Sequence, residues 1–348
     1  MTTAAYEHLA AALDRLPNGF PRTPAGTEIL ILKKLLSPEE AALAGQLSGT
    51  LEPADEIAAR LGRPAGEVRT ELLDLVRRGA AWLDKEGGKL RFRLAPFIVG
   101  LYEGQLERMD HELAHLVEHY MLDGGAAGIM GPEPALHRVM PTQGTVKSEW
   151  ILPYDDVRAL LLEAKSFWVR DCICREQQKH MGHPCSFSTH VCLSFSSSGR
   201  PGEITQEEAL AILEQTEKEG LVHTVSNVLE GHSYICNCCS CCCGILRGVT
   251  VYGLKNSVAA ANYYAVIDAA ACQGCGTCVE RCQMHAIALV DGVAVVDLER
   301  CIGCGLCVSG CPDGVPRMER KPADAIVRPP DNFTAWERVR LQNRGLAE

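Results

Sequence analysis

Two stretches of the chain repeat one cysteine spacing, CQGCGTCVERC at residues 272–282 and CIGCGLCVSGCP at residues 301–312. Each stretch has three cysteines at steps of three residues, and a fourth follows four residues later. Thiolates are ligands for soft metals. Between the two stretches, residues 286–298 predict a β-hairpin that turns at Asp291 and Gly292. The repeat therefore predicts a small segment that folds around metal.

This spacing favours two [4Fe–4S] clusters. Three closely spaced cysteines surround one cubane, and in two-cluster ferredoxins the fourth cysteine of each run ligates the other cluster. We expect cluster I to use Cys272, Cys275, Cys278 and Cys311, and cluster II to use Cys301, Cys304, Cys307 and Cys282. Gly274, Gly276, Gly303 and Gly305 would let the backbone fold tightly around the inorganic sulfurs. The alternative is a pair of zinc knuckles, which need two close cysteines and two distant ones.

The segment resembles the bacterial dicluster ferredoxin domain, which implies single-electron transfer through two clusters. One departure from that pattern is Gln283, which follows Cys282 where proline is usual. We expect Gln283 to alter local backbone hydrogen bonding and to leave ligation unchanged.

The composition limits the number of domains and the kinds of ligand that the chain can have. The chain has 348 residues, of which 47% are hydrophobic, enough for two or three domains with cores. Its formal charge of −10 argues against nucleic acid as the general ligand. The N-terminus lacks the pattern of a secretory signal, and no apolar run approaches the roughly 20 residues of a membrane span. We therefore expect a soluble, cytoplasmic protein.

The 18 cysteines divide the chain into three regions, in which the expected helices and hairpins predict an α+β multidomain protein. None precedes Cys172, ten lie between Cys172 and Cys243, and eight lie between Cys272 and Cys311. We predict a winged-helix-like domain plus a long helix over residues 1–124, a Cys-rich α/β domain over 125–264, a dicluster ferredoxin domain over 265–321 and an extended tail over 322–348.

The N-terminal region has the pattern of a winged helix. Residues 37–40 form a capping box, and short helices are expected over residues 55–61 and 67–78. A hairpin with alternating apolar residues then turns at Gly87 and Gly88. Because the expected recognition helix carries acidic and basic residues together, we favour a docking or homodimerisation module over DNA binding. A helix over residues 101–121 follows, and its HELAH stretch at 111–115 matches a zinc-protease pattern by chance.

The middle region predicts at least one further metal centre and has thiols enough for two. Its candidate ligands are Cys172, Cys174, Cys185, Cys192, Cys236, Cys238, Cys239, Cys241, Cys242 and Cys243. Six of them lie in the stretch CNCCSCCC at 236–243, too many for one tetrahedral centre. Adjacent thiolates repel unless a cation neutralises them. The additional centres would be [4Fe–4S] clusters or other metals, and Arg175 and Arg247 would offset their charge.

Histidines interleave with these thiols and are candidates for further ligands or proton donors. They are His180, His183, His190, His223 and His232. The Cys242-Cys243-Gly244 element is similar to one in heterodisulfide-reductase-type cluster domains, but the other spacings differ. Taken together, the chain resembles a family of 4Fe–4S proteins of anaerobic bacteria, a resemblance that implies the architecture and no particular activity.

Three functions fit this architecture. The first is an electron-transfer protein or redox subunit, in which two [4Fe–4S] clusters relay single electrons to a further Cys-ligated centre and a redox partner protein. The second is an iron–sulfur reductase with a catalytic centre in the middle region. The third is a cluster-based redox regulator that binds DNA through the winged helix. No catalytic residue follows from the sequence.

Overall fold

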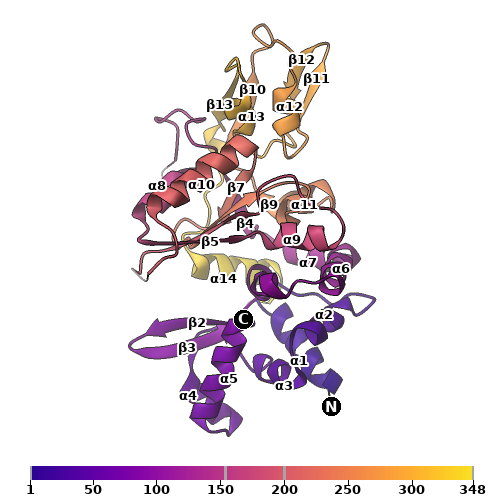
Figure 1. Ribbon diagram of the computed structural model, residues 1–348, viewed down its shortest axis with the longest axis vertical. Helices are drawn as coiled ribbons and strands as arrows, with labels where there is room; N and C mark the ends of the chain where they lie inside the picture. Colours follow the sequence, from indigo (N-terminus) through magenta and orange to yellow (C-terminus); the bar gives the residue numbers. More distant parts are fainter. Residues whose placement is uncertain (1, 153–154, 199–200, 347–348) are drawn as a thin grey trace. The chain divides into compact units, whose positions relative to one another are not determined.

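The computed structural model describes residues 2–152, 155–198 and 201–346, which form two compact units. The first unit consists of Met1–Pro132, Glu176–His183 and Arg338–Glu348, and the second of Glu133–Arg175 and Pro184–Glu337. Each unit combines helices with a sheet (Figure 1), consistent with the predicted α+β class. In the described parts of the chain, every helix is too short or too polar to cross a membrane.

The first unit packs helices against a three-stranded antiparallel sheet of order β1-β3-β2. Its elements are α1 (Thr2–Asp14), α2 (Thr27–Leu35), α3 (Pro38–Ala44), β1 (Glu52–Pro53), α4 (Ala54–Leu61), α5 (Ala65–Arg77), β2 (Ala81–Glu86), β3 (Lys89–Leu94), an irregular turn at Phe97–Leu101, a 3-10 helix at Glu103–Arg108, α6 (His111–Tyr120), a second irregular turn at Met121–Gly125 and α7 (Ala126–Met130). The predicted capping box is present, because Ser37 and Glu40 cap each other's backbone N–H groups. The predicted hairpin turn is also present, with Gly87 and Gly88 at positive φ.

The expected continuous helix over residues 101–121 is wrong. The chain is extended at Met109, and a new helix, α6, begins after Asp110. The Asp110 carboxylate accepts a hydrogen bond from the Leu113 N–H group at 2.8 Å. This N-cap starts a helix at a point where the apolar spacing alone predicts an uninterrupted one.

The second unit is built on a six-stranded sheet of order β5-β6-β8-β7-β4-β9, antiparallel except for the pair β4 and β9. Its strands are β4 (His137–Met140), β5 (Ser166–Asp171), β6 (His190–Ser196), β7 (Val222–Ser226), β8 (Tyr234–Cys238) and β9 (Val258–Ala259). Its helices around this sheet are α8 (Val157–Glu163), α9 (Ile173–His180), α10 (Gln206–Glu219), α11 (Gly244–Thr250) and a 3-10 turn at Lys255–Ser257. Helix α9 continues from the second unit into the first, since the division falls after Arg175.

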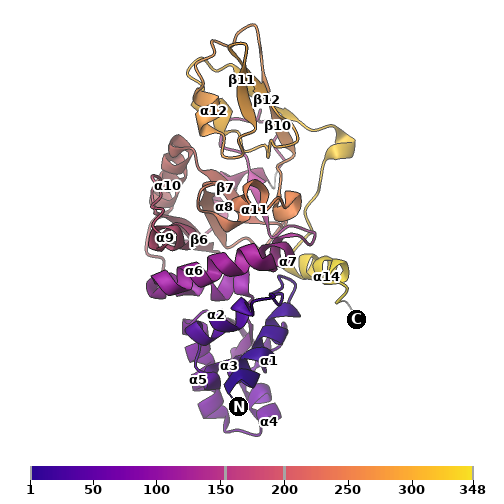
Figure 2. The same ribbon diagram turned by 90° about the vertical axis from the view of Figure 1, so that its right-hand side faces the viewer.

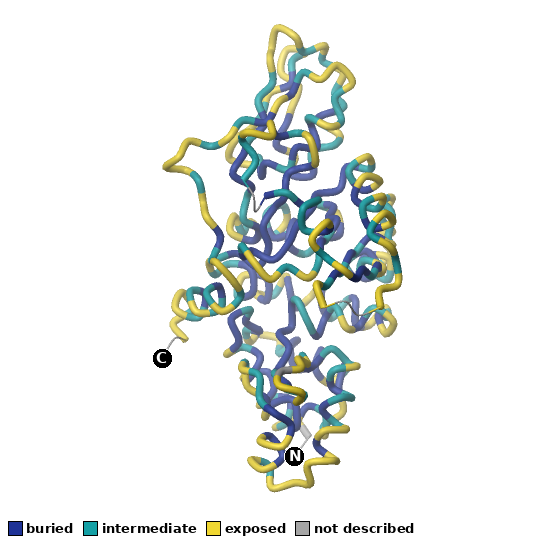
Figure 3. Tube along the Cα trace, turned by 90° about the vertical axis from the view of Figure 1, so that its left-hand side faces the viewer, coloured by how far each residue is buried: buried dark blue, intermediate teal, exposed yellow. Residues whose placement is uncertain are grey.

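The two faces of this sheet differ in character. Helices α8 and α10 cover one face and bury Leu161, Leu193 and Ile235 in an apolar core. Side chains alternate between the faces along a strand. Cys192, next to Leu193, and Cys236, next to Ile235, therefore point to the opposite face. Strands β4 and β7 are buried along their whole length, and in Figure 3 the buried parts of the chain are dark blue and the exposed parts yellow.

The C-terminal part of the second unit contains two antiparallel strand pairs and two short helices. Its elements are β10 (Tyr263–Ile267), α12 (Thr277–Arg281), β11 (Ile287–Val290), β12 (Val293–Val296), α13 (Leu306–Gly310) and β13 (Pro316–Arg320). The predicted hairpin forms, and Asp291 and Gly292 make its turn at positive φ.

A tail then follows the surface of the same unit (Figure 2), with a 3-10 turn at Ala323–Ala325, and leads into α14 (Phe333–Asn343). The Asn262 side chain accepts a hydrogen bond from the Val327 N–H group at 2.9 Å and donates one to the Val327 carbonyl at 3.1 Å. The Trp336 indole donates to the Ala135 carbonyl at 2.9 Å. Hydrogen bonds thus hold the tail at both ends.

Candidate metal centres

The eight C-terminal cysteines surround two hollows. One, of about 340 Å³, is lined by Cys272, Cys275, Cys278 and Cys311. The other, of about 380 Å³, is lined by Cys282, Cys301, Cys304 and Cys307. Each hollow takes three cysteines from one run and one from the other. These are the same two sets of four that the spacing predicts, and ligation of a cluster in each hollow stays a prediction.

Glycines bring the backbone close to each hollow. Gly274 and Gly303 occupy equivalent positions of the two runs, with φ of 68° and 71°. A Cβ atom on Gly274 would lie 2.3 Å from the Gly292 carbonyl oxygen, and one on Gly303 would lie 2.3 Å from the Tyr263 oxygen. No side chain fits there, so both the left-handed backbone and the close approach require glycine.

The two hollows differ in exposure. Cys275, at the first hollow, is exposed, and a hydrogen bond with Thr277 lowers the pKa of its thiol. Cys304 and Cys307 line the second hollow. Burial raises the pKa of Cys304 to about 12 and also raises the pKa of Cys307. Burial disfavours an isolated thiolate. The thiols of Cys304 and Cys307 therefore need a bound cation to become ligands, which a cluster would supply.

Six of the ten middle cysteines form a closed ring. The pKa of each thiol is shifted most strongly by two others, in the order Cys172, Cys174, Cys243, Cys238, Cys236, Cys192 and back to Cys172. We call this set the six-thiol ring. Hydrogen bonds from two neighbours lower the pKa of Cys172, and likewise lower that of Cys238, opposite it in the ring, to about 6.

The topology of the sheet assembles this ring. Strand β5 ends at Asp171, directly before Cys172, and pairs antiparallel with β6 near Cys192. Strand β8 pairs antiparallel with β6. Its C-terminal end, with Cys236 and Cys238, therefore lies at the same end of the sheet as Cys172 and Cys192. The helices that follow β5 and β8 contribute Cys174 and Cys243 at their starts. Residues more than 60 positions apart thus meet at one end of three neighbouring strands.

The remaining four middle cysteines form a second, tighter group. Cys185, Cys239, Cys241 and Cys242 have all their Sγ atoms within 4.8 Å of one another. We call this set the four-thiol site. The Sγ of Cys185 lies 3.8 Å from that of Cys239 and 3.7 Å from that of Cys241, and the Cys241 and Cys242 atoms are 3.6 Å apart. Cys241 is exposed, whereas Cys239 and Cys242 are buried.

Arg175 lies between the two groups and is 2% exposed. Its Nη2 atom donates to the Asn237 carbonyl at 3.0 Å, and its side chain is in hydrogen-bond contact with Cys185. Burial lowers the pKa of Arg175, but the thiolates of Cys172, Cys239 and Cys238 outweigh this and raise it. A buried guanidinium needs negative charge nearby. It therefore favours anionic sulfur in both groups, and its role beside a metal centre stays a prediction.

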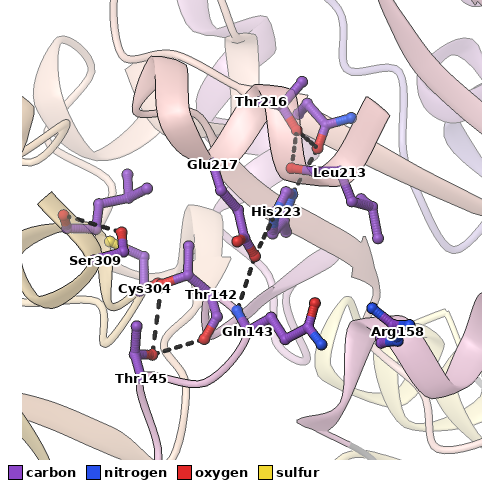
Figure 4. Close-up of polar contacts among 12 residues, drawn as sticks. Thr142, Gln143, Thr145, Arg158, Leu213, Thr216, Glu217, His223, Cys304 and Ser309 are labelled. Atoms are coloured by element: carbon purple, nitrogen blue, oxygen red, sulfur yellow. Dashed lines mark hydrogen bonds and ion pairs between the residues drawn. The ribbon is translucent and has the colours of Figure 1, made fainter. Parts of the chain in front are cut away.

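A polar network connects the second hollow with the middle cysteines (Figure 4). The Thr142 N–H group donates to the Cys304 carbonyl at 2.9 Å, and the Gln143 N–H group to Glu217 Oε1 at 2.8 Å. Glu217 contacts the buried His223 ring at 3.2 Å. His223 Nδ1 lies 2.6 Å from the side-chain oxygen of Asn237, which stands between Cys236 and Cys238. The network fixes the two cysteine-bearing regions to each other within the second unit.

Gln283 makes the most direct connection. It follows Cys282 and is buried, and its Oε1 atom accepts from the Ser240 N–H group at 2.9 Å and from Ser240 Oγ at 3.1 Å. Ser240 separates Cys239 from Cys241. The Gln283 Nε2 atom donates to the Gly220 carbonyl at 2.8 Å. Glutamine in place of the usual proline thus provides a side chain that connects the C-terminal cysteine segment with the turn around Ser240.

The structure separates the candidate histidines. His180 and His183 belong to the first unit, and His190 pairs at the surface with Asp171 at 2.7 Å. His223 lies in the network, and burial lowers the pKa of His232 to about 4. Among the described residues, no hydrogen bond joins these five histidines to a thiol, and the compact metal-ligand group contains cysteines alone. Sequence reasoning missed Thr142, Glu217 and Asn237, because single polar residues carry no pattern.

Residues 264–314 match the family model of the 4Fe–4S dicluster domain. None of the curated proteins compared with the chain matches it. The chain therefore contains a ferredoxin-like dicluster domain, and such a domain implies iron–sulfur electron transfer.

Proposed function

We propose that this protein relays single electrons between a redox partner protein and a thiol-ligated centre at the six-thiol ring, through two [4Fe–4S] clusters held by the eight C-terminal cysteines. Each cluster would supply one-electron chemistry when bound. The protein's own residues surround the clusters, tune their charge and connect them to the next centre.

The observation that carries this proposal is the bridge made by Gln283. It joins a residue next to Cys282 with Ser240, and Ser240 lies two positions from Cys238 of the ring. Electron tunnelling falls steeply with distance and is favoured by bonded and hydrogen-bonded routes. Gln283 supports such a route from the second hollow.

Exposure supports a direction for the relay. The first hollow reaches the surface at Cys275, whereas Cys304 and Cys307 of the second hollow are shielded and face the network. A partner would exchange electrons with cluster I, and cluster II would exchange them with the middle centre.

The relay is tested by replacing Gln283 with alanine in the anaerobically prepared full-length protein. After flash photoreduction, freeze-quenched EPR follows the electron from the dicluster to the middle centre. We expect Gln283→Ala to slow this transfer several-fold with unchanged iron content. Gln143→Ala is the matched control, because its side chain is exposed. An unchanged transfer rate in Gln283→Ala would contradict the proposal.

Iron and sulfide analysis tests the number of clusters. About 8 iron atoms per chain would restrict the clusters to the C-terminal segment, and about 12 to 16 would establish additional cluster iron. Absence of a [4Fe–4S] EPR signal after dithionite reduction would overturn the relay at its first step.

A second candidate function is catalysis at the six-thiol ring, as an iron–sulfur reductase. The observation in its favour is that six thiols exceed what one tetrahedral ion binds. Replacing Cys174 by serine would then abolish turnover with small electron acceptors and leave the dicluster EPR signal intact. Equal turnover by Cys174→Ser and the wild type would argue against catalysis there.

We propose a winged-helix fold for residues 37–94, supported by three helices followed by a hairpin that pairs with β1. Charges near α5 pair among themselves, with Arg63 on Glu71 at 2.6 Å and Arg78 on Glu40 at 2.5 Å. Cations already paired with carboxylates attract phosphate weakly, so docking to protein is favoured over DNA. A redox-dependent gel shift on the promoter region tests the regulator alternative, and size-exclusion chromatography tests homodimerisation.

A further inference from the structure

We propose that the ten middle cysteines form two chemically different centres, and that the four-thiol site binds one tetrahedral, thiolate-coordinated divalent ion, zinc or mononuclear iron. The inference extends the proposed function, since it separates a single-ion site from the ring that would accept electrons. Its evidence is the spacing of the sulfur atoms.

The distances within the four-thiol site match coordination of a single ion. A zinc–sulfur bond is about 2.3 Å, and the edge of a tetrahedron is about 1.63 times its centre-to-corner distance, so neighbouring sulfurs lie about 3.8 Å apart. The measured separations are 3.6, 3.7 and 3.8 Å. A disulfide would need about 2.05 Å. The four atoms are thus too far apart for disulfides and have the spacing of one shared ligand sphere.

The C-terminal hollows supply an internal comparison. In a cubane each thiolate binds a different iron atom, so the four thiolates enclose eight cluster atoms and lie well apart. Around the two hollows, the cysteines of each set influence one another through charge, and among the described residues no thiol–thiol hydrogen bond joins these eight. The four-thiol site shows the opposite arrangement, with its sulfurs in direct contact.

Local structure favours the same conclusion. Cys239, Cys241 and Cys242 belong to one tight turn, closed by a hydrogen bond from the Cys243 N–H group to the Cys239 carbonyl at 3.1 Å. Cys185 arrives from a distant loop and completes the set. Gln283 holds the turn through Ser240. Ligands from one turn plus a distant partner are characteristic of sites for a single tetrahedral ion.

Charge balance also fits. Four thiolates and one divalent ion carry a net charge of −2, which is costly in a partly buried position. Arg175 offsets part of this charge, because its buried guanidinium interacts with Cys185 and with the charge of Cys239.

The test measures metals and acid-labile sulfide in anaerobically purified full-length protein and in variants. Cys185→Ser and Cys241→Ser should each lose one zinc or one iron per chain, with sulfide unchanged. Cys174→Ser, in the ring, should keep that ion. Cobalt(II) exchanged into the site should give the d–d bands of tetrahedral thiolate coordination in wild-type protein and lose them in Cys241→Ser.

Two results would overturn the proposal. One is loss of about 4 iron and 4 sulfide together in Cys241→Ser, which would indicate a cubane. The other is no change in metal content in either variant. The dicluster EPR signal serves as the folding control for both variants. Electron-transfer rates are not needed, so failure of this assignment is distinguishable from failure of the relay.

Discussion

At the scale of single residues, the backbone around the C-terminal hollows passes too close to other backbone atoms for a side chain at two positions. Gly274 leaves room for the Gly292 carbonyl, which would be 2.3 Å from any Cβ atom. Gly292 has a similar positive φ, 79°, but open space at its own Cβ position. Gly274 therefore requires glycine for its backbone conformation and for the close approach of another backbone segment, whereas Gly292 requires it for conformation alone.

We predict that Gly274→Ala displaces the loop around the first hollow and lowers cluster I occupancy, since backbone cannot yield as a flexible side chain can. Iron per chain should fall by up to about 4, with the loss of one of two EPR components. Gly292→Ala carries the φ cost of about 1 kcal/mol without the clash and should retain both clusters. Equal iron content in the two variants would refute the role of close approach.

At the scale of elements, helix α10 begins with a capping box. The Thr205 side chain accepts from the Glu208 N–H group at 3.2 Å, and Glu208 accepts from the Thr205 N–H group at 2.7 Å. We predict that Thr205→Ala destabilises the second unit by about 1 kcal/mol, and that Thr205→Ser does so much less. Thermal unfolding should show a decrease in Tm of about 2–4 °C for alanine. A serine variant as unstable as the alanine variant would exclude capping as the cause.

Strand β4 brings a histidine into the sheet. His137 is buried between Thr224, at 3.2 Å, and the Tyr234 hydroxyl, at 2.9 Å, and burial lowers its pKa to about 4. Between pH 6.5 and 4 the unfolded chain binds a proton that the folded chain does not, so stability falls as pH decreases through this window.

We predict that His137→Gln reduces this pH dependence. One pKa unit corresponds to about 1.4 kcal/mol, so the loss of stability between pH 7 and 5.5 should shrink by about 1 kcal/mol. Tm measured at both pH values reports it. A parallel shift of both Tm values in His137→Gln would mean that packing, and not titration, is affected.

At the scale of the whole molecule, the tail contributes to the stability of the second unit. Trp336 is 5% exposed and bonds the Ala135 carbonyl, 201 residues away in sequence. We predict that Trp336→Ala costs about 3–5 kcal/mol of docking free energy and releases residues 322–337 to proteolysis. Arg328→Ala, on an exposed part of the tail, should be cleaved as slowly as wild type. Unchanged cleavage in Trp336→Ala would show that the tail is held elsewhere.

Local features of the chain were predictable from sequence. The capping box at Ser37, the turns at Gly87-Gly88 and Asp291-Gly292 and the two sets of four C-terminal cysteines depend on residues close together in the chain, or on a repeat that relates two short runs. The break at Asp110 was missed, because an N-cap inside an apolar pattern competes with helical periodicity and the pattern alone gives no sign of it.

The sequence by itself predicted the two sets of four C-terminal cysteines, because a repeated short spacing is a local property of the chain. Only the tertiary structure divided the other ten thiols into a ring of six and a site of four. Neighbours in CNCCSCCC fall into different groups, because strand β8 ends at Cys238, the turn after it redirects Cys239, Cys241 and Cys242, and helix α11 starts after Cys243. Their partners, Cys172, Cys174, Cys185 and Cys192, arrive through sheet pairing and loop packing, which no local spacing encodes.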